Sequence, residues 1–385
     1  MQKFEEYICQ GEPEQKEKAE AWSTAIGLQA VDGLKPSAYL YQVAQQHIEG
    51  EISIEQATRR VNAYYEEEDK RHEMSDTLEA DKVSVNIVHV LGEKVFAFTP
   101  PGLLAIHKRI FQGVFDHAGK VREVNITKRE WVLGGDTVLY VAARDIQPAI
   151  TYDLQQERKF DYSGLSPEEV AEHVAEFVSG LWQIHPFREG NTRTTAVFTI
   201  LYLRSLGYEV GNELFATHSW YFRNALVRSN YQHVERGVRK DFSFLIAFFR
   251  TLLLGEKHEL RNRYMHVHYE KLKHKWQSKD NKRDAASSEG INEGINEGIN
   301  EGINEGINEG INEGIKLTER EKQVLARVVK EPTATAGSLA KKLRCSVSAV
   351  ERALSGLKSK GRLAREGARK NGCWRVVAPG AAKNL

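Results

Sequence analysis

Two helical patterns joined by a nine-residue turn constrain the fold of this chain more than any other feature. The first helix is predicted over residues 166–185, because a capping box begins it at Ser166 and Pro186 ends it. A nearly all-apolar second helix follows over about 191–206. The turn must therefore bring the residues of 185–193, His-Pro-Phe-Arg-Glu-Gly-Asn-Thr-Arg, close to one point.

This turn combines groups that can hold a phosphate and activate a nucleophile. A helix that starts at Asn191 presents unpaired amides and partial positive charge, and Gly190 permits the positive φ that turns those amides inward. His185 can accept a proton near neutral pH, Glu189 suits Mg²⁺, and Arg193 suits a phosphate oxygen. Each residue alone is also common in turns without catalytic function, so only the combination indicates a site.

The composition is that of a globular protein. With 385 residues, 41% hydrophobic and 28% charged, the chain is long enough for roughly two or three domains. It contains no apolar run of the roughly 18–20 residues that a membrane span needs. Three cysteines are too few and too scattered for a disulfide framework or a zinc site. Because the N-terminus is acidic and lacks an apolar core, we expect no signal peptide and a cytoplasmic location.

The two ends of the chain differ in charge. Residues 1–81 hold 18 acidic and 8 basic side chains, whereas residues 316–385 hold 17 basic and 5 acidic ones, a net charge of +12. The basic end suggests a polyanion as partner. Between the ends, residues 291–314 are six copies of Ile-Asn-Glu-Gly, for which a flexible spacer is favoured over a helix that forms against a partner copy.

We therefore predict four parts, and a fold that is mainly α. They are a helical module at 1–81, a central domain at 82–260, a linker at 261–315 and a C-terminal domain at 316–385. Apolar residues at three- and four-residue steps predict further helices over 37–48, 53–65, 102–115, 217–231 and 240–254. Strand-like alternation allows a hairpin over 83–98, and β-rich flanks around two glycines predict a second one over 131–142.

The C-terminal residues have the element order of a winged helix. Three helical patterns are followed by a two-stranded pattern around residues 370–372. Such a domain can place its third helix and its wing on DNA, and the candidate contacts are Ser348, Arg352, Arg369 and Lys370. Winged helices also dock proteins, so DNA is the favoured partner but not the only one.

The motif at 185–193 resembles the signature of the Fic family, HPFx[D/E]GNGRxxR. Its surroundings agree, because residues 103–122 are similar to the family's upstream helix and its Ala-Gly-x-x-Arg segment. The resemblance covers roughly residues 84–255. It implies a helical Fic fold with a β-hairpin flap, and transfer of AMP from ATP to a Ser, Thr or Tyr hydroxyl of a protein.

The resemblance also implies residue roles. His185 would be the general base, Glu189 would hold Mg²⁺, and the phosphates would lie on Gly190, Asn191, Thr192 and Arg193. The flap, expected to hold the target segment by strand addition, would comprise Val132, Leu133, Thr137 and Val138, and the adenine would lie near Tyr221 and Asn224.

Two positions depart from the signature. Thr192 replaces the second glycine, and Ala196 stands where the last arginine would be, which leaves the choice of nucleotide open. Residues 37–65 also look like the small antitoxins that inhibit Fic toxins, and the nearest inhibitory segment is marked by Leu28, Asp32 and Gly33. Because the usual arginine partner is missing, we expect the module to persist as a lid with weak or rewired inhibition, or as plain helical packing. Restoring the pair with Ala196→Arg and changes at 31–32 is then expected to lower activity.

The sequence thus predicts a Fic-type protein adenylyltransferase that uses ATP and Mg²⁺ and modifies a target protein or itself. Two alternatives stay open: a DNA-binding regulator with a catalytically weak Fic domain, and a Fic enzyme that uses another nucleotide or phosphate-linked group. No membrane partner is expected. The sequence leaves the target, the DNA site and the oligomeric state, including a homodimer, undetermined.

Overall fold

The computed structural model describes residues 4–66, 75–210 and 213–274, together with parts of residues 321–376. By its internal contacts the chain divides into two compact units, Met1–Asn304 and Glu305–Leu385. Among the described residues, no helix is both long enough and apolar enough to cross a membrane.

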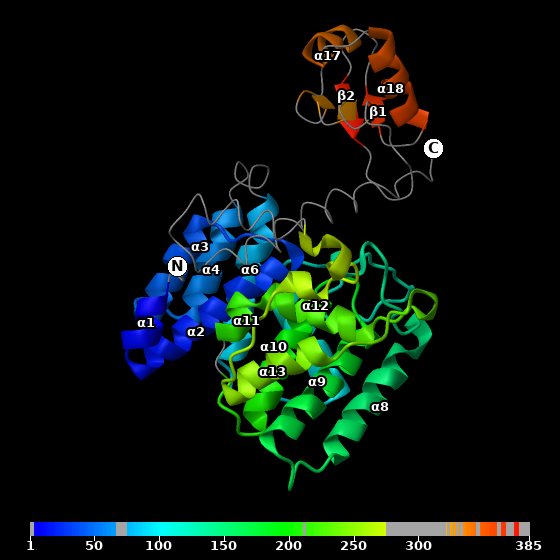
Figure 1. Ribbon diagram of the computed structural model, residues 1–385. Coiled ribbons are helices and arrows are strands. Elements are labelled where there is room, and N and C mark those ends of the chain that lie inside the picture. The colour runs from blue at the N-terminus through cyan, green and yellow to red at the C-terminus, as the bar shows by residue number, and fades with distance from the viewer. Residues whose placement is uncertain are drawn as a thin grey trace. The chain divides into compact units, whose positions relative to one another are not determined.

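The first unit is built from helices, which Figure 1 shows in chain order from blue to yellow. The α-helices are α1 (Glu5–Gln10), α2 (Pro13–Gly27), α3 (Ala38–Ile48), α4 (Ile54–Glu66), α6 (Ser75–Leu91), α7 (Pro100–Phe111), α8 (Ile146–Lys159), α9 (Pro167–Ile184), α10 (Asn191–Ser205), α11 (Glu213–Thr217), α12 (Ser219–Asn230) and α13 (Ser243–Leu254). The short 3-10 helices are η1 (Leu28–Asp32), η2 (Trp131–Leu133), η3 (Ala143–Asp145), η4 (Val234–Arg236) and η5 (Asn262–Met265). The prediction of a mainly α fold is confirmed.

Helices α9 and α10 form the centre of this unit. The predicted capping box is present, because the Ser166 side chain accepts from the Glu169 backbone and the Glu169 carboxylate accepts from the Ser166 backbone. Helix α10 is buried on all sides from Asn191 to Leu203. It contacts α7, α9, α6 and η1, so it joins the N-terminal helices to the rest of the core.

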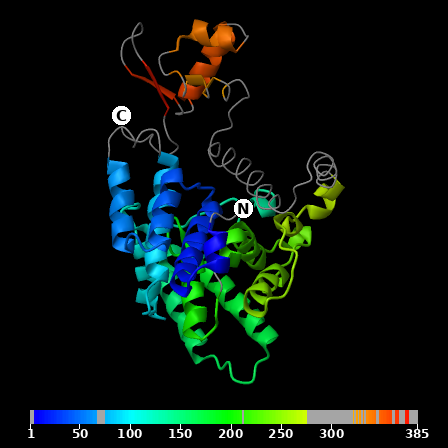
Figure 2. The ribbon, with the colours of Figure 1, turned by 90° about the vertical axis from the view of Figure 1, so that its left-hand side faces the viewer.

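The N-terminal helices share one hydrophobic core with the central helices. In Figures 1 and 2 the blue helices lie directly against the green ones, and α2 contacts both α6 and α11. The end of α2 approaches α11 so closely that a Cβ on Gly27 would lie 2.2 Å from the Ala216 carbonyl oxygen. This close approach places η1, which follows α2 directly, against α10 and α12.

The hairpin predicted over 83–98 is wrong. Residues Ser75–Leu91 form the single helix α6, which also runs across the boundary predicted at 81/82. Its β-branched residues are buried on several sides, because α6 packs against α2, α4 and α7 at once. A helix buried all round is apolar on every face, and its sequence then resembles that of a strand.

The hairpin predicted over 131–142 is also not formed as regular strands. Trp131–Leu133 is the 3-10 helix η2, and one isolated antiparallel bridge joins Arg129 to Thr137. The Val132, Leu133 and Val138 side chains are buried in the core. These apolar residues, which suggested strands, serve burial instead, whereas Leu139 of the same segment is 84% exposed.

The second unit contains α17 (Ala336–Lys342), α18 (Val347–Ser359) and the antiparallel strands β1 (Leu363–Glu366) and β2 (Cys373–Val376). Trp374 of β2 is buried in its core and donates to the Ala334 carbonyl oxygen at 3.1 Å. Arg352 is exposed on α18, and Ser348 lies on the same helix. Arg369, Lys370, the repeats at 291–314 and most of the first predicted helix lie outside the described residues, so the winged helix stays a prediction.

One close contact fixes the turn between α9 and α10. Gly190 has φ +74°, and a Cβ there would lie 2.2 Å from Cζ of Phe111 on α7. Both the backbone conformation and the Phe111 ring therefore demand glycine at this position.

We expect Gly190→Ala to destabilise the protein by roughly 3 kcal/mol or more, because it adds a core clash to the cost of a left-handed backbone. Gly237→Ala is a matched control, since Gly237 has φ +68° and open space around it. It should cost only about 1–2 kcal/mol. Thermal unfolding of both variants measures the difference. Equal losses of stability would show that the Phe111 ring can move aside without an energetic cost.

Candidate active site

The turn at 185–190 is bounded by two left-handed residues. His185 has φ 50°, and in the described part of the chain it is the only non-glycine residue with positive φ. Its backbone N–H donates to the Trp182 carbonyl oxygen and so closes the end of α9. Gly190, with φ 74°, then starts α10. A strained non-glycine backbone persists only where surrounding contacts hold it, which is common at functional sites.

Three contacts hold the turn in this shape. The Asn191 amide accepts from the Phe187 N–H at 2.9 Å and donates to the Phe187 carbonyl oxygen at 2.8 Å. His107 of α7 stacks on the Phe187 ring with centroids 3.6 Å apart. Because the Gly119 N–H donates to Nδ1 of His107, its Nε2 carries the proton and donates to the Glu189 carbonyl oxygen at 3.2 Å.

Arg122 holds the other side of the turn. Its buried guanidinium donates from Nε to the His185 carbonyl oxygen at 2.8 Å and also to the Val124 and Val141 carbonyl oxygens. Its backbone N–H donates to the Pro186 carbonyl oxygen at 2.9 Å. The Ala-Gly-x-x-Arg segment noted in the sequence therefore positions the backbone of the motif.

A cavity of about 250 Å³ opens at the start of α10. Its lining combines the motif, η1, the segment before η2 and α12, and it consists of Asp32, Ile126, Thr127, Lys128, Trp182, His185, Arg188, Glu189, Gly190, Asn191, Thr192 and Arg223. The structure thus brings together five of the predicted site residues, from His185 to Thr192, and the predicted inhibitory residue Asp32.

His185 is poised as a neutral base. It is 5% exposed, and its ring stacks on Tyr140 with centroids 4.0 Å apart. Burial, followed by the charge of Lys128, holds its pKa well below the ordinary value of 6.5. Within the described residues its Nδ1 has no hydrogen-bond partner. The ring is therefore uncharged at neutral pH and can accept a proton.

Two further motif residues face the same cavity. Glu189 is exposed at its edge, and partial desolvation and the nearby Asp32 raise the pKa of its carboxyl, while Lys128 opposes this. Thr192, the departure from the glycine of the signature, accepts a hydrogen bond from Nε1 of Trp182 at 2.9 Å. Its hydroxyl thus fixes the Trp182 indole beside His185.

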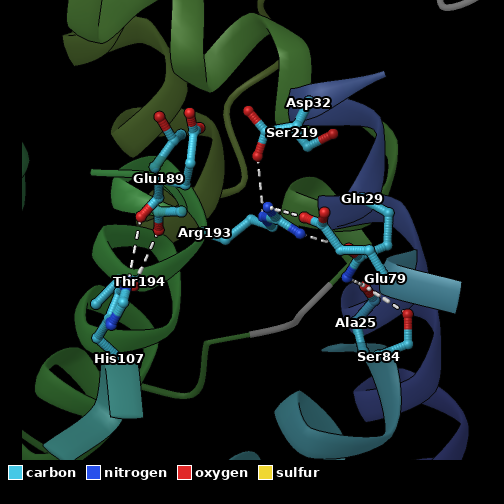
Figure 3. A network of polar contacts seen from close by, with 12 residues as sticks. Ala25, Gln29, Asp32, Glu79, Ser84, His107, Glu189, Arg193, Thr194 and Ser219 are labelled. Atoms are coloured by element: carbon cyan, nitrogen blue, oxygen red, sulfur yellow. Dashed lines mark hydrogen bonds and ion pairs between the residues drawn. The ribbon is translucent and has the colours of Figure 1, made fainter. Parts of the chain in front are cut away.

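Arg193, predicted as a phosphate contact, reaches toward η1 and α6. Its 1%-exposed guanidinium donates to Gln29 at 2.9 Å and to Glu79 at 2.7 Å, and forms an ion pair with Asp32 at 2.9 Å. Figure 3 shows it reaching from α10 to these side chains on η1 and α6. Arg193 is not among the residues that line the cavity.

The expectation that Asp32 had lost its partner is also corrected. Asp32 pairs with Arg193 and lies 3.8 Å from Nζ of Lys128. Burial would raise the pKa of its carboxyl, but Arg193 and Lys128 outweigh burial and lower it. Leu28 is buried, and Gly33 follows η1 with φ 75°. Ala196, at the position of the signature's last arginine, is fully buried in α10.

The two residues predicted to border the adenine make hydrogen bonds within the core. Tyr221 donates to the Phe244 carbonyl oxygen at 3.2 Å, and Asn224 donates to Asn262 of η5 at 2.9 Å. Both are buried, and neither lines the cavity. Their contact with a base stays a prediction, as does the capture of a target by the predicted flap residues.

Sequence reasoning missed two cations, Lys128 and Arg223. Arg223 of α12 forms a buried ion pair with Glu130, with Nη2 2.9 Å from Oε1 and 2.7 Å from Oε2. Lys128 lies two residues before Glu130 and is 42% exposed. Both lie outside any motif, and only the fold brings them to the cavity. Only their positive charge could have indicated them, and that charge does not distinguish them among the 54 lysines and arginines of the sequence.

Comparisons with known proteins indicate a family for part of the chain. Residues 97–203 match the model of the Fic/DOC family. Protein adenylyltransferase VbhT of Bartonella schoenbuchensis is 33% identical over 105 residues, which cover 27% of this chain but only 21% of that protein. A probable protein adenylyltransferase Fic of Salmonella typhimurium is 28% identical over 155 residues, 40% of this chain and 68% of that protein.

Among solved structures, the BepC protein of Bartonella tribocorum with bound AMPPNP aligns over 43% of this chain and 80% of that one, with a TM-score of 0.33 and 19% identity. The family match at 97–203 includes α7, α9 and the turn at 185–190, whereas Asp32 and Arg223 of the cavity lie outside it. Residues 97–203 of this chain are therefore a Fic/DOC family domain.

Proposed function

We propose that this chain transfers AMP from ATP to a hydroxyl group of a protein, either a target or the chain itself. One observation carries the proposal: a single cavity joins the neutral, strained His185 to the amides at the start of α10. A base next to an anion site is the arrangement that nucleotidyl transfer requires.

The phosphates would lie at the start of α10. The amides of its first turn have no partner within the helix, and the helix dipole adds partial positive charge there. Glu189, exposed at the cavity edge, would hold Mg²⁺ together with phosphate oxygens. Bound there, the ion would neutralise charge on the phosphates.

His185 would take the proton as the hydroxyl oxygen attacks. The new bond joins that oxygen to the α-phosphorus, and the bond from the α-phosphorus to the oxygen that bridges to the β-phosphate breaks. Pyrophosphate leaves with the electron pair, and the hydroxyl proton passes to the His185 ring. The name protein adenylyltransferase of the two relatives, at 33% and 28% identity, supports this reaction.

Incubation with each nucleoside triphosphate and Mg²⁺, labelled at either the α- or the γ-phosphate, tests the proposal. We expect label from α-labelled ATP to enter protein, and His185→Ala to reduce the rate by about 10²- to 10⁴-fold, since it removes the general base. His258→Ala is the control, because His258 is exposed and far from the motif in sequence.

The other outcomes identify the alternatives. Label from another α-labelled nucleoside triphosphate would show that the substrate is that nucleotide and not ATP. Label from the γ-phosphate alone would indicate transfer of phosphate. No label under any condition would contradict the proposal and favour a regulator that only binds nucleotide. Because the pKa of His185 is lowered, the base stays unprotonated as pH falls through 6.5, and the rate should decline only well below that pH.

We also propose that η1 restrains the enzyme. Asp32 places a negative charge in the cavity where phosphates would enter, and with Gln29 and Glu79 it holds the Arg193 guanidinium. This arrangement supports the reading of residues 1–81 as an antitoxin-like lid, although the contacts differ from the expected ones.

Asp32→Ala should raise ATP affinity and the rate of label transfer by roughly tenfold, because one repelling charge leaves the cavity. Asp116→Ala, which removes an exposed carboxylate that does not line the cavity, is the control. Measurement of both quantities on folded protein decides the matter, and an unchanged or lower rate for Asp32→Ala would argue against restraint.

A second proposal concerns the C-terminal unit, which would bind DNA. Its support is the net charge of +12 over 316–385, together with the exposed Arg352 on α18. Affinity for duplex DNA should fall steeply with salt, as counterion release requires. Absence of binding even at low salt would rule out DNA as the partner.

A further inference from the structure

The cavity has its own set of cations, and Arg193 does not belong to it. The basic residues that line it are Lys128, Arg188 and Arg223. Arg193 is held by three acceptors on η1 and α6, and Ala196 carries no charge. Apart from the exposed Arg188, the side-chain cations available to a nucleoside triphosphate in this cavity therefore come from residues outside the motif.

Arg223 is a fixed cation at the cavity. Its side chain is 7% exposed, and Glu130 binds it at 2.7 Å while the guanidinium lies 5.0 Å from the centre of the Trp220 ring. Burial would lower its pKa, but Glu130 and Asp32 outweigh burial and raise it, so the charge persists. Because its position is set before any ligand binds, little conformational entropy would be lost on binding a phosphate.

Lys128 is the adjustable cation. It is 42% exposed at the cavity and lies 3.8 Å from Asp32, a distance at which the pair is weakly held. Its flexible stem lets the ammonium group turn from Asp32 to a phosphate oxygen. Lys128 and Arg223 come from different segments, before η2 and on α12, yet both face the cavity into which His185 opens.

We propose that Lys128 and Arg223 bind the polyphosphate chain of the nucleotide and so take the place that Arg193 and the missing arginine at 196 leave empty. This inference rests on the proposed function, since it names the residues that select a triphosphate at that same site. It predicts that the two residues matter more for ATP than for AMP, because AMP has only one phosphate.

The test measures dissociation constants of ATP and AMP for the full chain in Mg²⁺ by isothermal titration calorimetry. Lys128→Gln should weaken ATP binding by about tenfold, the usual effect of losing one charged hydrogen bond, and AMP binding by less than about twofold. Lys94→Gln is the matched control, because Lys94 is exposed and does not line the cavity. It should change neither constant.

Arg223 needs a paired variant, because Arg223→Gln alone would leave Glu130 buried without its partner. Arg223→Gln combined with Glu130→Gln removes both charges, and its thermal unfolding shows whether the fold is kept. The same selective loss of ATP affinity is expected. If this variant does not fold, the Lys128→Gln result decides alone.

Three results would overturn the inference, and they separate it from the proposed function. Unchanged ATP affinity in Lys128→Gln refutes it, even if wild-type protein shows transfer of AMP that depends on His185. Equal losses for ATP and AMP refute selection of the polyphosphate in the same way. No nucleotide binding by the wild type, with no label transfer, refutes both this inference and the proposed function.

Discussion

The buried cluster around Arg193 is the interaction on which the first unit depends. A guanidinium that is 1% exposed can be kept charged inside a protein only if acceptors surround it, and here Asp32, Gln29 and Glu79 do so. These acceptors lie on η1 and α6, whereas Arg193 lies on α10. The cluster therefore ties the N-terminal helices to the helix that starts the candidate site.

This tie has a consequence for the chemistry of the cavity. Arg193 is held by two carboxylates and an amide and does not line the cavity, whose basic side chains are Lys128, Arg188 and Arg223. Asp32 contacts both Arg193 and a cation of the cavity, because it pairs with Arg193 and lies near Lys128. If the two proposals hold, nucleotide binding and restraint by η1 would be coupled through this one carboxylate.

The sequence predicted the parts that depend on local contacts. The capping box at Ser166, the helices on either side of the turn and the positive φ of Gly190 are all present, because each is set by residues within one or two turns of the chain. Prediction failed for α6 and for residues 131–142, since burial by distant helices made their sequences resemble strands.

By itself, the sequence determined which residues of the turn come together. The two flanking helices can be joined by so short a turn in only a few ways. The residues of the turn that line the cavity as a result include His185, Glu189, Gly190 and Asn191. Only the tertiary structure decided the direction of Arg193 and the source of the cavity's other cations. A side chain as long as arginine turns to whichever acceptors packing brings within reach. Those acceptors, Gln29 and Glu79, lie more than a hundred residues away along the chain.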